Sequence, residues 1–521
     1  MTLDNGALHL DRREILKGSG ALGAAILLPT TVYAQKSEPS RGGTLRVTIP
    51  YNPAALDPIT GRNAPDFNAL YAIFDALIDF EPDTLELRPG LAREWTFTDP
   101  LTLVLDLQEG VKFHDDTPFD AEAVKFNLER TRNDPRSNVK GDLAAVDAIE
   151  VTGPLQVTLR LKQPNAGLPA ILTNRSGCIV SPASIKAAAD GNVDRNPVGT
   201  GPFKFAEWRD NDLIRVEKNP DYWQKDQPYL DGINFRIANE LNTAARTVVA
   251  GEADLALNLG GQQIATAKRD PELIAEATPT LTFWTMAFNY GAPPLNDVRV
   301  RQALSYAINR EDLNKVLMLG LGEPSSTIFP SGFWATDPET AHFYKHDVAK
   351  ARSLLAEAGF PDGIDIEGWG WPDQASVQRT EMIVSQMAEA GIRLKITPAP
   401  AAQTMQNFYI QKKGSVSLNA GGGIPDPSLA YERLFAASGF FNASGIELDG
   451  FRELLDATVA TADHEERQAA LHKLQRFVVE NALHMPLFIS AGMSVRTKRI
   501  QGFKFGLTIG PKFHKVWLAE A

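Results

Sequence analysis

Residues 296–311 of this chain read NDVRVRQALSYAINRE, and this segment carries the clearest pattern in the sequence. Its apolar residues recur at helical spacing, at Val300, Ala303, Leu304, Ala307 and Ile308. The pattern predicts an amphipathic helix with Asp297 as its N-cap, because a short acidic side chain accepts the first free backbone N–H groups. A second helix is expected from Asn309 to Gly320.

The segments after this one combine helical patterns with a short strand. One helix is predicted from Asp347 to Gly359 and another over residues 376–390. A third is expected near the C-terminus, after a capping box that begins at Asp463. Residues 392–396 alternate apolar and polar side chains, as a strand does. The second half of the chain is therefore expected to be an α/β lobe with a mixed or parallel sheet.

The first half is richer in strands. Leu45, Val47 and Ile49 alternate with polar residues, and the same period returns at residues 101–107 and 157–161. A turn at Asp99-Pro100 precedes the strand at 101–107, so this strand is expected to form a hairpin with the segment before it.

Size and charge exclude several classes of protein. The chain has 521 residues, enough for about three domains, and 52 basic against 64 acidic residues give it a formal net charge of −12. We expect no nucleic-acid partner, because binding phosphates requires a basic patch and the sequence has none. The single cysteine, Cys178, excludes a disulfide within the chain and any Cys-based zinc site.

The N-terminus has the pattern of an export signal. An arginine pair at residues 12–13 precedes a short apolar run over residues 18–28, and residues 32–34 (VYA) form an A-x-A-like cleavage site. Residues 1–34 are predicted to be a twin-arginine-like signal peptide cleaved after Ala34, with general secretory export as the alternative. No cysteine lies at the cleavage site and no later stretch reaches 18 apolar residues, so we expect a periplasmic protein without a lipid anchor.

The sequence shows no catalytic constellation. It lacks a G-x-S-x-G elbow and a phosphate-binding P-loop. His342 and His346 have metal-like spacing but no glutamate of an H-E-x-x-H motif, so two exposed histidines are expected. Cys178 is expected to be a small apolar side chain. We therefore predict no catalytic residues, no metal site and no cofactor.

Aromatic side chains in polar, Gly-rich surroundings are the candidate ligand contacts. Glycines let the backbone approach a ligand, and an indole ring offers apolar contact together with an N–H donor. The candidate residues that share this setting are Trp284, Asn289, Trp369, Trp371, Gly422, Gly423 and Asp426. The alternative is ordinary core tryptophans beside a flexible turn.

Beyond its helical pattern, the segment 296–311 closely resembles the signature helix of the extracellular solute-binding proteins of family 5. These are the periplasmic dipeptide-, oligopeptide- and nickel-binding components of ABC importers. Other segments are similar to landmarks of the family and stand in its order: residues 56–58, 91–95, 111–118, 197–203, 218–223, 349–359 and 442–445. The resemblance implies an α/β, two-lobed periplasmic binding protein fold, type II-like in its large cluster C form, with an extra subdomain inserted in lobe I.

The resemblance also implies a domain order and a function. Lobe I is expected over residues 35–80, 195–285 and 493–521, with the inserted subdomain over 81–194 and lobe II over 286–492. Such a protein closes its lobes on a small solute, here a peptide or peptide-like compound, and delivers it to permease and ATPase subunits in the inner membrane. We expect a monomer that is not an enzyme.

The expected ligand contacts differ from those of the peptide binders. The resemblance places Gly423 where peptide binders have an Asp for the α-amino group. No base stands at residues 368–371, where dipeptide binders have an Arg for the terminal carboxylate, although Asp426 or Arg379 could substitute. Because an unpaired terminal charge is costly to enclose, an aromatic, sugar-containing or metal-complex ligand is the alternative to a peptide. An exported hydrolase is a further alternative.

Overall fold

The structure is a computed structural model that describes residues 38–61, 66–508 and 510–520. Residues 39–521 form one compact unit. The predicted signal peptide at residues 1–34 lies outside the described residues. Among the helices that the structure describes, none combines the length and the apolar character needed to cross a bilayer.

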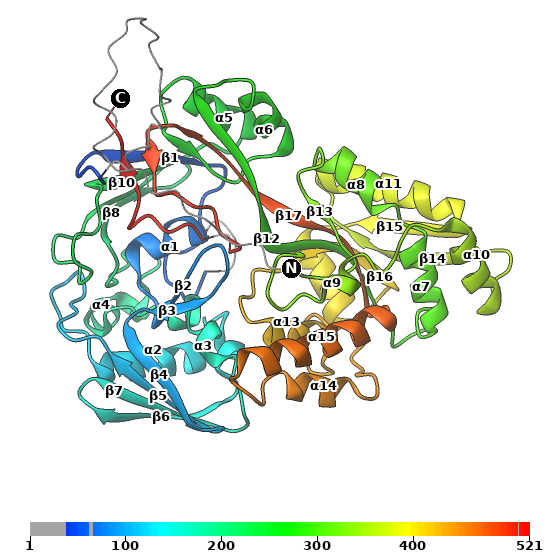
Figure 1. Ribbon diagram of the computed structural model, residues 1–521, viewed down its shortest axis with the longest axis horizontal. Helices are drawn as coiled ribbons and strands as arrows, with labels where there is room; N and C mark the ends of the chain where they lie inside the picture. Colours follow the sequence, from blue (N-terminus) through cyan, green and yellow to red (C-terminus); the bar gives the residue numbers. More distant parts are fainter. Residues whose placement is uncertain (1–37, 62–65, 509, 521) are drawn as a thin grey trace, which may run out of the picture. The chain divides into compact units, whose positions relative to one another are not determined.

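An eleven-stranded mixed sheet runs through the compact unit. Ten of its strands lie in the spatial order β15 (Ile392–Pro398), β14 (Ile364–Gly370), β16 (Val416–Gly421), β12 (Leu273–Phe288), β17 (His484–Thr497), β11 (Leu255–Ala256), β1 (Thr44–Ile49), β10 (Gly232–Ile237), β9 (Leu213–Lys218) and β8 (Phe203–Arg209). The eleventh strand, β13 (Glu323–Pro324), pairs with β17. The long strands β12 and β17 pair antiparallel, from Leu273 beside Thr497 to Ala287 beside His484. Figure 1 shows this pair running from the strands of the first half of the chain to those of the second half.

The first-half end of this sheet confirms the alternation in the sequence. Leu45, Val47 and Ile49 of β1 are all buried, and β1 pairs in parallel with β10. Three helices pack near this end of the sheet: α1 (Phe67–Ile73), α5 (Leu241–Val249) and α6 (Gly261–Ala267).

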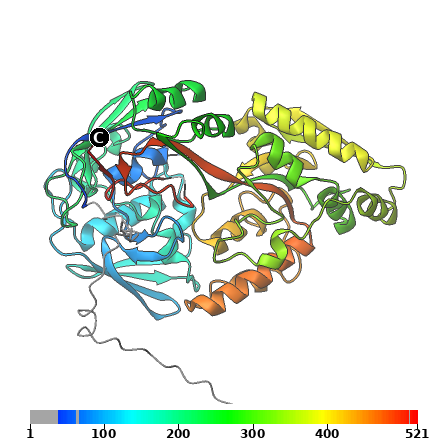
Figure 2. The same cartoon turned by 45° about the horizontal axis from the view of Figure 1, so that its top comes forward.

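A separate four-stranded antiparallel sheet contains the predicted hairpin. Its order is β4 (Ala92–Asp99), β5 (Thr102–Leu107), β7 (Gln156–Leu161) and β6 (Val146–Gly153). This sheet is drawn in blue and cyan in Figures 1 and 2. Together with α2 (Ala121–Asn133) it encloses its own hydrophobic cluster. Nearby lie the β2–β3 pair (Ile78–Phe80, Leu87–Pro89), α3 (Leu168–Ile171) and α4 (Pro182–Ala187).

Helices dominate the second half, as the sequence predicts. They are α7 (Val298–Tyr306), α8 (Arg310–Leu317), α9 (Pro338–Ala341), α10 (Val348–Glu357), α11 (Gln374–Glu389), α12 (Ala401–Thr404), α13 (Pro427–Phe435), α14 (Phe451–Ala457) and α15 (His464–Glu480). The predicted caps Asp297, Asn309, Asp347 and Asp463 all accept a hydrogen bond from a backbone N–H group of the first turn. Helices beside a mixed sheet give the α/β class that was expected.

Helix α8 ends earlier than its sequence predicts. Leu319 and Gly320 both have positive φ, 52° and 75°, which no α-helix can accommodate. The N–H group of Gly320 donates to the carbonyl oxygen of Asn314 at 3.1 Å. The glycine therefore belongs to the turn that closes the helix, and the helix itself stops at Leu317.

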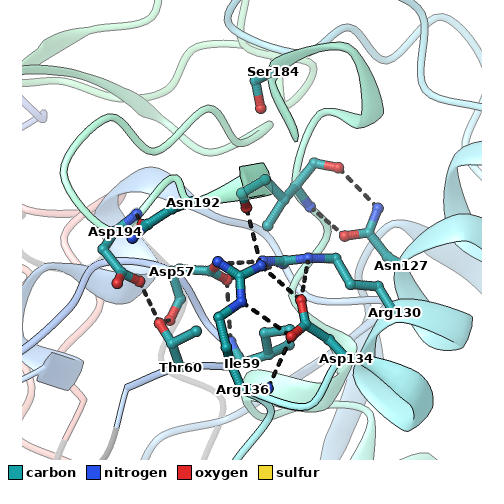
Figure 3. A network of polar contacts seen from close by, with 12 residues as sticks. Asp57, Ile59, Thr60, Asn127, Arg130, Asp134, Arg136, Ser184, Asn192 and Asp194 are labelled. Carbon is teal, nitrogen blue, oxygen red and sulfur yellow. Dashed lines mark hydrogen bonds and ion pairs between the residues drawn. The ribbon is translucent and has the colours of Figure 1, made fainter. Parts of the chain in front are cut away.

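A buried ion pair fastens α2 to the segment before α1. Figure 3 shows Arg130 and Asp57 at the centre of a polar network, with Nη1 of Arg130 3.0 Å from Oδ1 of Asp57. Just beyond α2, the backbone N–H of Asn138 donates to the carbonyl oxygen of Ile59 at 2.8 Å. These contacts hold the start of the short 3₁₀ turn η2 (Lys140–Leu143), which reaches the cavity described next.

Candidate ligand-binding cavity

A cavity of about 910 Å³ lies where both halves of the chain supply walls. The first half contributes residues around α1, η2 and the turn that follows α3. The second half contributes Trp371 just after β14, the π-helical turn η5 (Met405–Ile410), and residues between Asn419 and Phe441, which include part of α13. Central residues of β12 and the first residue of β17 line it between these walls. Its size is in the range of ligand sites.

The first-half wall is rich in polar groups, and we call it the polar wall. Asn138, Asp142, Asn174 and Arg175 all line the cavity. The side chain of Asn174 accepts a hydrogen bond from the N–H of Arg175 at 2.8 Å, which fixes the turn that carries both residues. Oγ of Ser176 donates to a carboxylate oxygen of Asp142 at 2.5 Å. This wall can therefore offer oriented hydrogen-bonding groups to a ligand.

The second-half wall is aromatic. Four of its side chains carry aromatic rings, and we call this group the aromatic wall: Trp371, Tyr409, Phe440 and Phe441. The rings of Tyr409 and Phe441 meet edge to face with their centroids 5.6 Å apart. Phe440 lines the cavity and is nevertheless 53% exposed, so a ligand at this rim would cover apolar surface.

The hydroxyl of Tyr409 is oriented by a neighbouring amide. Nδ2 of Asn419 donates to Oη of Tyr409 at 2.7 Å. Burial raises the pKa of the phenol well above its usual value, so the hydroxyl keeps its proton. Because the oxygen already accepts from Asn419, its proton remains a donor for another group.

His484 lies at the base of the cavity as a neutral imidazole. It packs edge-on against Phe283 and Phe435, and its Nδ1 lies 3.1 Å from Oγ1 of Thr285. Burial lowers its pKa to about 3. It therefore brings no positive charge to the cavity at neutral pH.

Ion pairs hold the charged side chains of the cavity. Arg433 of α13 donates to Asp142 of η2, and this pair joins the two walls. Burial raises the pKa of Asp142, while Arg433 opposes that shift. Asp426 accepts from Arg467 of α15, and Arg175 lies 3.5 Å from Asp66.

The glycine run before α13 brings backbone to the cavity. Gly422 has φ of +125°, and a Cβ placed on it would lie 2.0 Å from the carbonyl oxygen of Leu281. Gly423 has φ of +77°, and a Cβ there would meet nothing within 4 Å. The first glycine is required by close packing, whereas the second opens onto free space.

The structure brings most of the predicted residues together. Trp371, Gly422, Gly423 and Asp426 line the cavity. Trp284 lies behind Trp371, with the ring centroids 5.7 Å apart and edge-on.

Asn289 and Trp369 lie apart from the cavity lining. The amide of Asn289 donates to the carbonyl oxygens of Lys412 and Gly414 at 3.3 and 3.4 Å. Nε1 of Trp369 donates to the carbonyl oxygen of Lys413 at 2.8 Å. Both side chains therefore hold the loop between η5 and β16.

The two residues considered as substitutes for the peptide-binding charges are engaged elsewhere. The guanidinium of Arg379 lies 3.4 Å from the ring centroid of Trp284, and burial lowers its pKa to about 10. Asp426 is 1% exposed and is the N-cap of α13 as well as the partner of Arg467. Neither has the open position that a ligand charge needs.

Sequence reasoning missed the polar wall and much of the aromatic wall. Asn138, Asp142, Asn174 and Arg433 stand in ordinary polar segments without any distinguishing spacing. The doublet Phe440-Phe441 did carry a signal, because it precedes a Gly-containing polar turn, as the selected tryptophans do.

The residues singled out for other chemistry are located as follows. Cys178 is buried, and burial raises the pKa of its thiol to about 12, as expected for an unreactive side chain. His342 and His346 are exposed. Within the described ranges, no group of three or more His, Cys, Asp or Glu residues is placed to hold a metal ion.

Comparison with known proteins gives consistent matches along the chain. The profile of the bacterial extracellular solute-binding proteins, family 5 (middle region), matches residues 86–442. The glutathione-binding protein GsiB of Salmonella paratyphi A is 29% identical over 474 residues, covering 88% of this chain and 91% of GsiB.

Solved structures share the fold. DppA from Helicobacter pylori, an ABC transporter-associated periplasmic binding protein in complex with the peptide STSA, has a TM-score of 0.80 and 25% identity, covering 92% of this chain and 99% of DppA. HbpA2 from Haemophilus parasuis has a TM-score of 0.81 and 24% identity, covering 92% of this chain and 100% of HbpA2.

Proposed function

Because the chain belongs to the bacterial extracellular solute-binding proteins of family 5, we propose that its cavity encloses a peptide-like solute for an ABC importer. Members of this family are periplasmic binding proteins with two lobes. The permease and ATPase subunits of the importer are the proposed partners in the inner membrane, and the proposed receptor is a monomer.

One observation carries this proposal: the cavity of about 910 Å³ takes its walls from the two halves of the chain. A solute held there contacts both walls at once, so its binding favours the closed arrangement over an open one. Strands β12 and β17 connect the halves and are the natural position for a hinge. No catalytic step is needed for this role.

The proposed lobe boundaries follow the sequence. Lobe I comprises residues 35–80, 195–285 and 493–521, the inserted subdomain residues 81–194, and lobe II residues 286–492. The four-stranded sheet with its separate hydrophobic cluster supports an inserted subdomain. For export, residues 1–34 are the proposed twin-arginine-like signal peptide, and cleavage after Ala34 leaves a chain without a lipid anchor.

The relatives support a peptide-like ligand, since GsiB is named for glutathione and DppA holds the peptide STSA. A second candidate is a non-peptide solute with an aromatic group. It is favoured by the aromatic wall and by the open space at Gly423, where peptide binders were expected to have an acid.

Native mass spectrometry and small-angle X-ray scattering test the receptor role. Protein purified from the periplasm is expected to carry a solute of defined mass. Removal of this solute should increase the radius of gyration, and its return should reverse the change. A protein that carries no solute, and whose scattering stays constant with glutathione, STSA and a broad metabolite panel, would contradict the proposal. Turnover of the bound compound would favour the hydrolase instead.

A further inference from the structure

We infer that the solute carries no free ammonium group and presents an aromatic or similarly flat apolar group to the aromatic wall. The inference rests on the proposed receptor function and narrows its ligand. It depends on the two acids that line the cavity, on the open space at Gly423, and on the uneven distribution of polar and aromatic side chains.

The first acid, Asp142, has both carboxylate oxygens engaged. Oδ1 accepts from Arg433, and Oδ2 accepts from Oγ of Ser176 at 2.5 Å. The Asp142 side chain is only 11% exposed. Because Arg433 already balances its charge and little of its side chain is exposed, Asp142 offers a ligand ammonium a much weaker partner than an open, unpaired carboxylate would.

The second acid, Asp426, is engaged in the same way. Oδ2 accepts from Arg467, and Oδ1 accepts from the N–H of Leu429 at 2.9 Å, as the N-cap of α13 requires. The residue is 1% exposed. Its charge is therefore balanced by Arg467, and almost none of the carboxylate is accessible to a ligand ammonium.

The neighbouring acid Asp66 is 2% exposed and lies 3.5 Å from Arg175. Apart from Asp142 and Asp426, the described residues that line the cavity carry no carboxylate. The glycine run contains none either, and a Cβ on Gly423 would have nothing within 4 Å. An enclosed ammonium would consequently lose its hydration without gaining a carboxylate.

The aromatic wall and the polar wall together describe an amphipathic solute. Trp371 is backed by Trp284, and Tyr409 is backed by Asn419, so these rings are held in place. Flat rings prefer to meet other rings edge to face or offset, and they bury large apolar areas. The polar wall supplies neutral donors and acceptors through Asn138 and Asn174.

Four forms of one aromatic dipeptide test the inference by isothermal titration. They are Phe-Phe, Phe-Phe amide, N-acetyl-Phe-Phe and N-acetyl-Phe-Phe amide, titrated into the mature chain after removal of any co-purified solute. Each acetylated form is expected to bind at least ten-fold tighter than its free-amine counterpart. Equal or tighter binding of the free amines would overturn the inference.

Absence of binding by all four forms up to millimolar concentration would also overturn it, because the aromatic class would then be wrong. The receptor role is judged separately, since compaction by any other solute would leave that role standing. The two failures are therefore distinguishable.

A variant at Gly423 supplies the missing carboxylate. Gly423→Asp places an acid in the open space, and Asp tolerates the positive φ of this position better than most residues do. We expect the affinity for Phe-Phe to rise at least ten-fold, while the neutral Gly423→Asn variant shows no such gain. Equal affinities of the two folded variants would count against the inference.

A second pair of variants tests the aromatic wall. Trp371→Leu should weaken binding of N-acetyl-Phe-Phe at least ten-fold. Trp208→Phe is the control, because Trp208 lies under Arg195, away from the cavity lining. If both variants bind N-acetyl-Phe-Phe with similar affinity, the inferred contact between the solute and the aromatic wall is wrong.

Discussion

At the scale of single residues, the cavity shows how charge is accommodated inside an apolar enclosure. Arg467 is 8% exposed, and it donates from Nε to the carbonyl oxygen of Thr458 at 2.9 Å and from Nη2 to Asp426 and Ser428. The pair thus joins the start of α15 to the start of α13. Burying two charges together is tolerable, but leaving one of them without its partner is expensive.

Arg467→Met tests this cost. The substitution keeps most of the apolar volume and leaves Asp426 as a buried, unpaired carboxylate. We expect the free energy of unfolding to fall by about 3–5 kcal/mol, measured by guanidinium denaturation. Arg393→Met is the matched control: Arg393 and its partner Asp365 are 55% and 75% exposed, so this change should cost less than about 1 kcal/mol. Equal losses would show that the buried pair has no special role.

At the scale of elements, the turn between β16 and α13 is decisive for the cavity. Gly422 approaches the backbone of β12 so closely that only a residue without Cβ fits, because Leu281 O would lie 2.0 Å from that atom. The turn therefore packs against β12 while Gly423 remains open to the cavity. A short distance further on, Asp426 begins α13 and directs Arg433 toward Asp142.

Two alanine variants separate close packing from backbone conformation. Gly423→Ala should lower the free energy of unfolding by about 1–2 kcal/mol, which is the cost of holding alanine in the left-handed backbone conformation. No steric cost is added, because the new Cβ meets nothing within 4 Å. Gly422→Ala adds a collision with backbone and should destabilise the protein clearly more, with loss of solute binding. Denaturation midpoints of the two variants give the comparison. If Gly422→Ala were the milder change, the packing described for this turn would be incorrect.

At the scale of the whole molecule, distant segments meet to close the cavity. Besides the Asp142–Arg433 pair, the N–H of Ala166 donates to the carbonyl oxygen of Val459 at 3.0 Å. The same folding buries His484 and partly buries His114 and His514, which come from different parts of the chain. Burial lowers the pKa of His114 to about 4, of His484 to about 3 and of His514 to about 4.

These histidines should make stability depend on pH. Below about pH 6.5 the unfolded chain protonates them, whereas the folded chain does not until about pH 4, so stability falls as the pH is lowered across this window. Burial raises the pKa of Asp75 to about 6, and this residue acts in the opposite direction between about pH 4 and 6. For these four groups together, the unfolded chain binds about two protons more than the folded chain near pH 5. The free energy of unfolding should therefore change by roughly 3 kcal/mol per pH unit there.

Denaturation curves between pH 4.5 and 7 measure this dependence. His484→Gln should reduce the slope by about one proton, because one of the three imidazoles with a lowered pKa is removed. His346→Gln, at an exposed position, should leave it unchanged. A slope that is the same in all three proteins would argue that His484 is not buried as a neutral group.

The sequence by itself determined the local elements of this protein and its family. Caps such as Asp297 and Asp347 act within three residues of their own position, and the alternation in β1 reports burial directly, so both can be read from neighbouring residues. The helix at residues 298–306 and its resemblance to the family could likewise be predicted without knowing any tertiary contact.

Only the tertiary structure decided which side chains enclose the cavity. Trp369 and Trp371 are two residues apart, yet Trp369 donates to Lys413 while Trp371 lines the cavity, because the chain leaves β14 between them. Asp142 and Arg433 are separated by 291 positions and meet through packing alone. Enclosure depends on contacts between remote segments, and no local pattern of residues encodes which remote segments will meet.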